Sequence, residues 1–154
     1  MKRLIRRPLS LLAFSSFLLA GCAGGPRLNE SQTSLPPVPE GNGRIYFYRT
    51  STAGAAVQPS IKLNGEKVGV AKPRGVFYVD RPPGNYEVET KTEVTRKLSL
   101  QLAEQQTRYV RFKVGMGFFI GHISPELVEP AIGESEIGRC RLISASDPLN
   151  VAEQ

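Results

Sequence analysis

The sequence predicts a mainly β protein, a small antiparallel β-sandwich of about seven strands with a short helix near its carboxyl end. Apolar and polar residues alternate with a period of two between residues 44 and 114, which is typical of strands with one buried and one solvated face. The 154 residues include 15 Gly and 12 Pro, a content that favours short strands. Turn signals separate the apolar segments at the spacing of a sandwich.

Seven segments are expected to form the strands, and they span residues 44–48, 61–63, 68–70, 76–79, 86–93, 97–102 and 109–114. The second and third flank Asn64-Gly65, where both positions tolerate the positive φ of a tight hairpin. The fourth is apolar on both faces, which indicates a central strand. Pro82-Pro83-Gly84 predicts a type II turn, because Pro presets φ and Gly accepts a positive φ. Residues 134–142 are expected to form the helix, with acidic residues near its start.

Residues 1–21 are interpreted as a lipoprotein signal peptide. A basic segment, residues 1–7, precedes an apolar stretch at residues 8–20, which is shorter than the roughly 20 residues that a membrane-spanning helix needs. Leu19-Ala20-Gly21-Cys22 follows and resembles the lipobox of bacterial lipoproteins. The resemblance implies cleavage between Gly21 and Cys22 and acylation at Cys22. Two or more acyl chains would hold the protein firmly on a membrane.

The residue after the lipobox bears on location. In Gram-negative lipoproteins, an aspartate directly after the acylated cysteine often signals retention in the inner membrane. This chain has Ala23 there, which favours the outer membrane with the domain facing the periplasm. A Gram-positive cell surface is the alternative.

The remaining chain divides into three parts. Residues 22–42 contain four prolines and few large apolar side chains, so they are expected to form a flexible tether behind the lipidated cysteine. Such a coil would span about 25 Å. Residues 43–143 are expected to form the β-sandwich, and residues 144–154 a flexible tail.

The formal net charge of +6 does not indicate nucleic-acid binding. Four of the cations lie within residues 1–7, so the chain would carry a net charge of only +2 after cleavage. Beyond the tether the cations alternate with acidic residues, as in Glu87, Glu89, Lys91 and Glu93, whereas nucleic-acid binders usually show a clustered basic face.

The domain resembles DUF2846, a bacterial lipoprotein family of unknown function. The resemblance is carried by residues 43–49 (GRIYFYR), 61–65 (IKLNG), 83–88 (PGNYEV) and 109–112 (YVRF). The Pro-Gly-x-Tyr-x-Val motif is also similar, more distantly, to surface β-sandwich modules of the PEGA and carboxypeptidase-regulatory type. The resemblance implies a small β-sandwich on the envelope and brings no activity, cofactor or site residue with it.

No catalytic group, cofactor or metal site is expected. His122 is the single histidine, whereas a zinc site usually takes several His or Cys ligands. Cys140 is interpreted either as a small buried apolar residue on the helix or as a reactive or intermolecular thiol. Glu87 and Glu89 share one face, as paired carboxylates for glycoside hydrolysis would, but they lie on a regular strand among cations.

Two surfaces are candidates for contact. Phe118–Ile120 is interpreted either as core or as an exposed apolar loop that touches a membrane or partner. A set of cations is interpreted either as a basic face for anionic lipid or polysaccharide, or as solvated charges that prevent edge pairing. The set consists of Lys91, Arg96, Lys97, Arg108, Arg111 and Lys113.

The sequence therefore predicts a lipid-anchored envelope lipoprotein whose sandwich is a binding or structural module. The expected partners are the membrane, through the anchor, and an envelope protein or polysaccharide. A periplasmic hydrolase with an unrecognised site is the first alternative. A membrane- or surface-adhesive protein that acts through residues 118–120 is the second.

Overall fold

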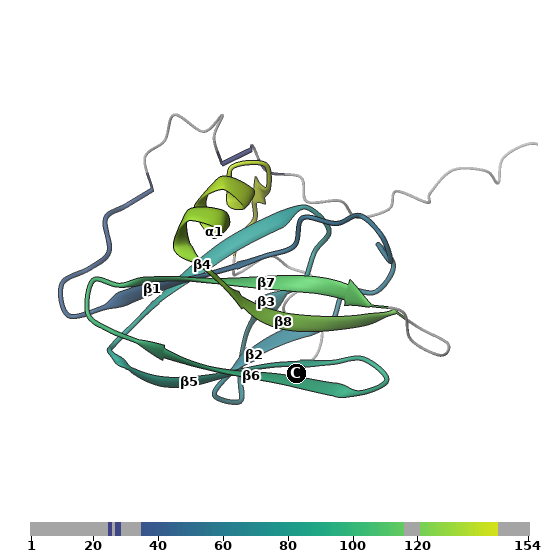
Figure 1. The fold of residues 1–154 in the computed structure, drawn as a ribbon, viewed down its shortest axis with the longest axis horizontal. Coiled ribbons are helices and arrows are strands. Elements are labelled where there is room, and N and C mark those ends of the chain that lie inside the picture. Colours follow the sequence, from purple (N-terminus) through teal and green to yellow (C-terminus); the bar gives the residue numbers. More distant parts are fainter. Residues whose placement is uncertain (1–24, 26, 29–34, 116–120, 145–154) are drawn as a thin grey trace, which may run out of the picture.

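The computed structural model describes Gly25, Arg27, Leu28, residues 35–115 and residues 121–144. These residues form two sheets that pack face to face, with one helix outside them (Figure 1). The helix, α1, spans Pro130–Ile137. The strands are β1 Gly43–Tyr48, β2 Ser60–Leu63, β3 Glu66–Val70, β4 Gly75–Arg81, β5 Gly84–Lys91, β6 Thr95–Leu102, β7 Thr107–Gly115, β8 His122–Val128 and β9 Arg141–Leu142. The prediction of a mainly β sandwich with a short helix is confirmed.

One sheet has five strands in the order β8-β7-β1-β4-β9, and the other has four in the order β3-β2-β5-β6. Two pairings, β1 with β7 and β4 with β9, are parallel, so the expectation of a wholly antiparallel sandwich is corrected for the five-stranded sheet. The chain passes through the whole four-stranded sheet between β1 and β7, so no hairpin imposes an antiparallel direction on that pair. Strand alternation alone does not reveal this.

The hairpin between β2 and β3 forms as predicted. Leu63 pairs with Glu66, so Asn64 and Gly65 alone make the turn. Their φ angles are 50° and 86°, which matches a turn that needs two left-handed residues. The Asn64 side chain also accepts a hydrogen bond of 2.7 Å from the Glu87 amide, and this bond ties the hairpin to β5.

The Pro82-Pro83 segment is not the predicted type II turn. Gly84 does not adopt a positive φ; it begins β5 and pairs with Leu102. The reason is topological, because β4 and β5 belong to different sheets and the chain crosses between layers here. The Tyr86 hydroxyl donates a 2.7 Å hydrogen bond to the Pro82 carbonyl and fixes this corner, as tyrosines do in other sandwiches.

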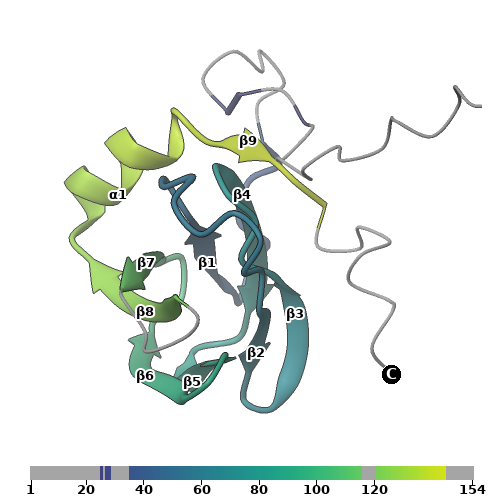
Figure 2. The same cartoon turned by 90° about the vertical axis from the view of Figure 1, so that its right-hand side faces the viewer.

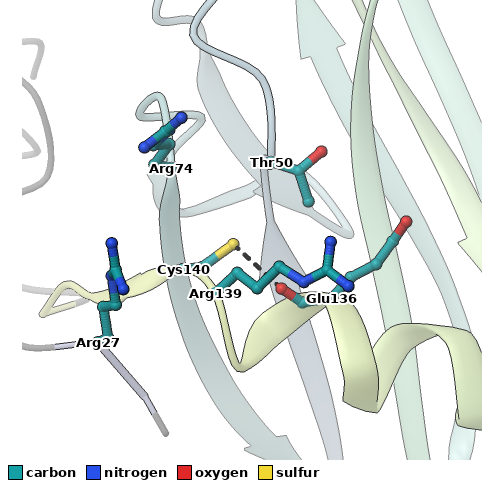
Figure 3. A pocket seen from close by; sticks show the side chains of 6 residues that line it. All are labelled: Arg27, Thr50, Arg74, Glu136, Arg139 and Cys140. Atoms are coloured by element: carbon teal, nitrogen blue, oxygen red, sulfur yellow. Dashed lines mark hydrogen bonds between the residues drawn. The ribbon is translucent and has the colours of Figure 1, made fainter. Parts of the chain in front are cut away.

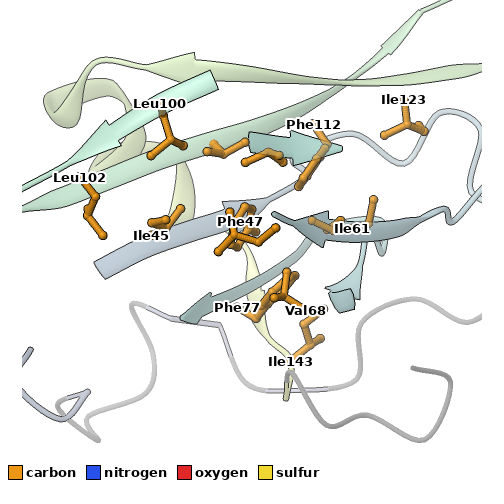
Figure 4. Packing of buried hydrophobic residues seen from close by; sticks show 14 residues of the cluster. Ile45, Phe47, Ile61, Val68, Phe77, Leu100, Leu102, Phe112, Ile123 and Ile143 are labelled. Atoms are coloured by element: carbon orange, nitrogen blue, oxygen red, sulfur yellow. The ribbon is translucent and has the colours of Figure 1, made fainter. Parts of the chain in front are cut away.

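The main core lies between the two sheets (Figure 4). Its aromatic centre is Phe47, which stacks on Phe77 at 5.2 Å and on Phe112 at 6.3 Å between ring centroids. Gly69 lies directly against the Phe77 ring, where an added Cβ would come within 2.3 Å of it. Aliphatic side chains from both sheets complete the layer, among them Ile45, Ile61, Leu63, Val88, Leu100, Leu102, Val110 and Ile123.

A second apolar layer covers the outer face of the five-stranded sheet. Figure 2 shows α1 on this face, on the opposite side of the sheet from β5 and β6. The layer consists of Tyr46, Tyr48, Val76, Tyr109, Val128, Ile137 and Cys140, with Leu28, Leu35 and Tyr78 at its margin. All six residues of β1 are therefore buried. The helix begins at Pro130 rather than at residue 134, and Gly133 lets it approach the Tyr109 ring, where a Cβ would lie at 2.3 Å.

The described part of residues 22–42 lies against the domain. Arg44 donates hydrogen bonds to the carbonyls of Pro36 and Pro37, at 2.9 and 3.5 Å. Leu28 and Leu35 pack against the outer layer. At these positions Arg44 and the outer layer supply binding partners that the segment lacks by itself.

Candidate functional site

Gly25, Arg27 and Leu28 are the first described residues, and we call them the amino-terminal segment. A pocket of about 450 Å³ lies where this segment meets the end of α1 (Figure 3). It is lined by Arg27, Thr50, Arg74, Glu136, Arg139 and Cys140. Three of the six are arginines, and they come from three separate segments of the chain. Figure 3 shows the three guanidinium groups around the Cys140 sulfur. We call this site the arginine pocket.

Backbone hydrogen bonds hold the walls of the arginine pocket. The Arg74 carbonyl accepts a 2.7 Å bond from the Arg141 amide, which joins the turn before β4 to β9. Arg74 has a φ of 55°, the left-handed conformation of a tight turn. The Leu28 amide donates at 3.0 Å to the Cys140 carbonyl, so the amino-terminal segment is fixed to the turn that follows α1.

The carboxylate of the pocket is engaged elsewhere. Glu136 accepts a 2.6 Å bond from the Tyr48 hydroxyl on one oxygen and a 2.6 Å bond from Arg111 on the other. Burial and the bond to Glu136 raise the pKa of the Tyr48 hydroxyl, which therefore stays protonated as the donor. Within the described residues, no ion pair joins Arg74 or Arg139 to a carboxylate. Arg74 and Arg139 therefore give the pocket positive charge that suits an anion.

Cys140 lies at the base of the pocket and is 1% exposed. Its Sγ lies 3.8 Å from the Arg49 carbonyl and 3.7 Å from the Glu136 carbonyl. Burial raises the pKa of this thiol to about 11, with a smaller contribution from the Glu136 charge. It is thus protonated near neutral pH and is a poor nucleophile. It belongs to the outer apolar layer and follows the helix instead of lying on it.

The other candidate groups of the sequence do not converge. His122 begins β8, and its Nδ1 lies 3.5 Å from the Thr92 hydroxyl. The described residues contain no group of three or more His, Cys, Asp or Glu that could hold a metal. Glu87 and Glu89 lie on the outer face of β5, where Lys97 pairs with both, at 2.8 and 3.4 Å.

The six cations do not form one basic face. Lys91 and Lys97 belong to the four-stranded sheet, whereas Arg111 and Lys113 belong to β7 in the other sheet. Arg111 and Lys113 both pair with Glu126, at 3.0 and 2.8 Å. The hydrogen bond from Lys113, followed by that from Arg111, holds the pKa of Glu126 below its usual value. The hypothesis of a joint basic face is therefore wrong.

Several predicted features lie outside the described residues. These are the signal segment 1–21, Gly21, Cys22 and Phe118–Ile120. Among the helices that the structure does describe, none has the length and apolar character needed to cross a membrane.

Sequence analysis missed the buried Arg49, which is 0% exposed. Its guanidinium donates to the carbonyls of Val57 and Ala71, at 2.8 and 3.0 Å, and to those of Ala53 and Gly54. Burial lowers the pKa of this guanidinium, and its Nε has no hydrogen-bond partner among the described atoms. Arg49 thus fastens the loop between β1 and β2. No local signal distinguishes it from a surface arginine.

Comparison with known proteins supplies a family. The model of a family described as "Protein of unknown function (DUF2846)" matches residues 39–122. An uncharacterized protein of Haemophilus influenzae is 24% identical over 132 residues, which cover 82% of this chain and 79% of that protein. The solved amino-terminal domain of AlgF from P. aeruginosa matches with a TM-score of 0.43 and 16% identity, covering 58% of this chain and 94% of that domain. The family match includes Thr50 and Arg74 of the arginine pocket; its other four residues lie outside it.

Proposed function

The chain belongs to the DUF2846 family of proteins of unknown function, and we propose that it is a lipoprotein of the bacterial envelope, anchored through acylated Cys22. In this proposal the β-sandwich is a binding or structural module. The observation that carries it is Leu19-Ala20-Gly21-Cys22 directly after a basic and then an apolar segment. The small residues fit an extended chain in a protease cleft, and the cysteine supplies the thiol for the thioether.

The architecture suits a module that presents a surface. The two sheets bury a continuous core between them, and the second layer under α1 stiffens the central strand β1. Positions on a rigid scaffold can hold a contact surface in one geometry. The arginine pocket is the described surface that most favours an anionic partner, such as a lipid headgroup, an acidic polysaccharide or an acidic protein segment.

A hydrolase is a less favoured function than a binding module. The groups on which an enzyme would depend are placed apart: the Cys140 thiol is buried and protonated, Lys97 pairs with Glu87 and Glu89, and His122 faces Thr92. A hydrolase needs a nucleophile or activated water within hydrogen-bond reach of a base. The adhesive alternative depends on residues 118–120, outside the described part.

Membrane fractionation tests the anchor. We expect the wild-type protein to sediment with membranes after a high-salt wash and the mature amino-terminal peptide to carry fatty acyl groups on Cys22. Cys22→Ser is expected to lose both properties. Cys140→Ala removes the other thiol and is the matched control, so it should remain acylated and membrane-bound. A mature protein that still begins with Met1, or one without acyl groups, contradicts the proposal.

The proposed outer-membrane location has its own test. Ala23→Asp places an aspartate after the acylated cysteine, and we expect it to move the protein to the inner membrane in a Gram-negative host. Ala23→Ser is the control and should leave the location unchanged. Density-gradient separation of the two membranes provides the measurement. Co-sedimentation of wild type and Ala23→Asp in one fraction contradicts the outer-membrane assignment.

A further inference from the structure

We propose that the arginine pocket faces the bilayer and binds the phosphate groups of anionic phospholipids, so that the domain sits on the membrane in one orientation. The inference rests on the proposed acylation of Cys22. It goes further by naming the surface that meets the membrane and the chemical group it binds. Three features of the structure carry it: where the amino-terminal segment is fixed, how little chain separates it from Cys22, and which charges surround that point.

The amino-terminal segment is fixed at β9, beside the pocket. The Arg141 guanidinium donates a 2.8 Å hydrogen bond to the Gly25 carbonyl, and Arg27 forms an isolated antiparallel bridge with Arg141. Gly25 approaches the backbone so closely that an added Cβ would lie 1.8 Å from the Leu142 carbonyl oxygen. Leu28 then bonds to the Cys140 carbonyl and packs into the outer layer. Gly25 is thus fixed beside β9, two residues before Arg27 of the pocket.

Only a short piece of chain separates this attachment from the anchor. Cys22 and Gly25 are three peptide links apart, and three links span at most about 11 Å. An acylated cysteine lies at the level of the headgroups, because its chains are buried in the hydrocarbon. Gly25 must then lie within about 11 Å of the membrane surface. Arg27, which lines the pocket, follows Gly25 by two residues. A free tether over residues 22–42 would have reached about 25 Å and allowed any orientation.

The charges near the attachment are positive and accessible. Arg27, Arg74 and Arg139 line the pocket, Arg141 lies beside it, and all four are exposed. The pocket carboxylate, Glu136, is already bonded to Tyr48 and Arg111. Guanidinium groups bind phosphate with two parallel hydrogen bonds, and cations held near an anionic membrane surface are attracted to it. Because about 11 Å is the upper limit for the distance of Gly25 from the membrane surface, the guanidinium groups can approach the headgroups to within the Debye length of about 8 Å. At that distance the attraction is only partly screened.

A second depression on the molecule provides a matched control. Lys62, Lys67 and Lys91 line it on the four-stranded sheet, together with Gln58, Pro59, Ser60, Glu89 and Thr92. It also carries three cations, and its volume, about 500 Å³, is similar to that of the arginine pocket. Its strands belong to the other sheet, away from β9 and the attachment point. If vesicle binding depends on where the cations lie, substitutions at the two sites should have different effects. If it depends on net charge alone, they should have the same effect.

Vesicle binding by the mature chain with Cys22→Ser tests the inference, because without acyl chains the measured affinity reports the protein surface. The vesicles contain phosphatidylcholine alone or with phosphatidylglycerol. We expect binding only to the second kind. Replacing Arg27, Arg74 and Arg139 together with Gln should weaken it by roughly fivefold per arginine, about 100-fold in all. Replacing Lys62, Lys67 and Lys91 with Gln should weaken it less than about threefold. All six side chains are exposed or half-buried, and thermal unfolding of each variant checks that it folds. If the triple arginine variant does not fold, the double variant Arg74→Gln/Arg139→Gln takes its place.

Each of the following outcomes would overturn the inference. An equal loss in both triple variants would show attraction by net charge only, and unchanged binding in the arginine variant would remove the pocket from the contact. Inorganic phosphate is the third probe: binding of free phosphate in the pocket without vesicle binding would assign the site to a soluble anion. If the wild type is acylated but the arginine substitutions do not weaken vesicle binding, only this inference is overturned. If the wild type is not acylated, the proposed function and this orientation are both overturned.

Discussion

Arg44 of β1 and Asp80 of β4 are direct cross-strand partners, and their side chains form a two-pronged ion pair with N–O distances of 2.7 and 2.9 Å. The Arg44 guanidinium also lies 4.0 Å from the centre of the Tyr78 ring and donates to the Pro36 and Pro37 carbonyls. One side chain thus joins two strands to the segment that precedes β1. The ion pair raises the pKa of Arg44, whose charge is retained although the residue is 4% exposed.

We expect Asp80→Ala to destabilise the domain, because it leaves the buried Arg44 charge without its partner. Breaking a buried pair costs about 3–5 kcal/mol, and the partial exposure of Asp80 should keep the loss near about 3 kcal/mol. Urea unfolding measures the change. Glu66→Ala is the control, since it removes an exposed 3.4 Å pair with Arg81 and should cost under about 1 kcal/mol. Equal losses in the two variants would contradict the structural role of the Arg44–Asp80 pair.

Replacement of Arg49 should loosen the loop between β1 and β2. Arg49→Met fills similar space but leaves the carbonyls of Val57 and Ala71 without their donor, at about 1–3 kcal/mol for each buried group left unsatisfied. We expect a lower free energy of unfolding and faster proteolysis between residues 50 and 59. Arg139→Met, at an exposed arginine, should change neither quantity. Protease resistance equal to that of the wild type would contradict the assigned role of Arg49.

The Cys140 thiol should be inert in the folded protein. With a pKa of about 11, roughly one thiol in a thousand is ionised at pH 8, and the buried sulfur is also inaccessible. We expect slow reaction with a thiol-specific disulfide reagent at pH 8, and rapid reaction once urea unfolds the chain. The Cys22→Ser form keeps Cys140 as its one thiol and gives an unambiguous signal. Fast reaction of the native protein would contradict the burial of this side chain.

The same thiol makes stability depend on pH. The pKa of this thiol is higher in the folded protein than in the unfolded chain. Its contribution to the free energy of unfolding is therefore complete below about pH 8.5 and is lost as the pH rises toward 11. Between pH 8.5 and pH 10.5 we expect the wild type to lose about 2–3 kcal/mol more than Cys140→Ala. Subtracting the variant removes the effects of the lysines and tyrosines that titrate in the same range. Parallel pH profiles for the two proteins would contradict the prediction.

Tyr86→Phe removes the hydrogen bond that closes the corner at Pro82 while keeping the ring. We expect a loss of about 1 kcal/mol, since the bond is partly exposed and the Pro82 carbonyl can turn to water. Thermal unfolding measures it. Tyr78→Phe is the control, because the contact between Tyr78 and Arg44 involves the ring face, so the effect should be smaller. A larger loss in Tyr78→Phe would indicate that the hydroxyl of Tyr86 does not hold the corner.

The features that the sequence predicts well are those that depend on neighbouring residues. Asn64-Gly65 makes the expected hairpin because positive φ is a property of two adjacent positions. The alternation of β5 is observed as expected, with Val88 and Thr90 buried and Glu87 and Glu89 turned outward. The lipobox-like pattern at residues 19–22 is likewise local, and the anchor that it predicts stays a prediction.

The sequence by itself determined that the chain folds as a two-layer β protein of this family, because strand period and turn chemistry depend on short-range sterics and side-chain polarity. Only the tertiary structure decided that β1 and β7 run parallel and that Tyr46 and Tyr109 stack at 5.4 Å beneath a helix instead of facing water. It also decided that Arg27 lies beside Arg74 and Arg139 in one pocket. The physical reason is that burial and charge pairing depend on distances between residues far apart in the chain, which no local pattern contains.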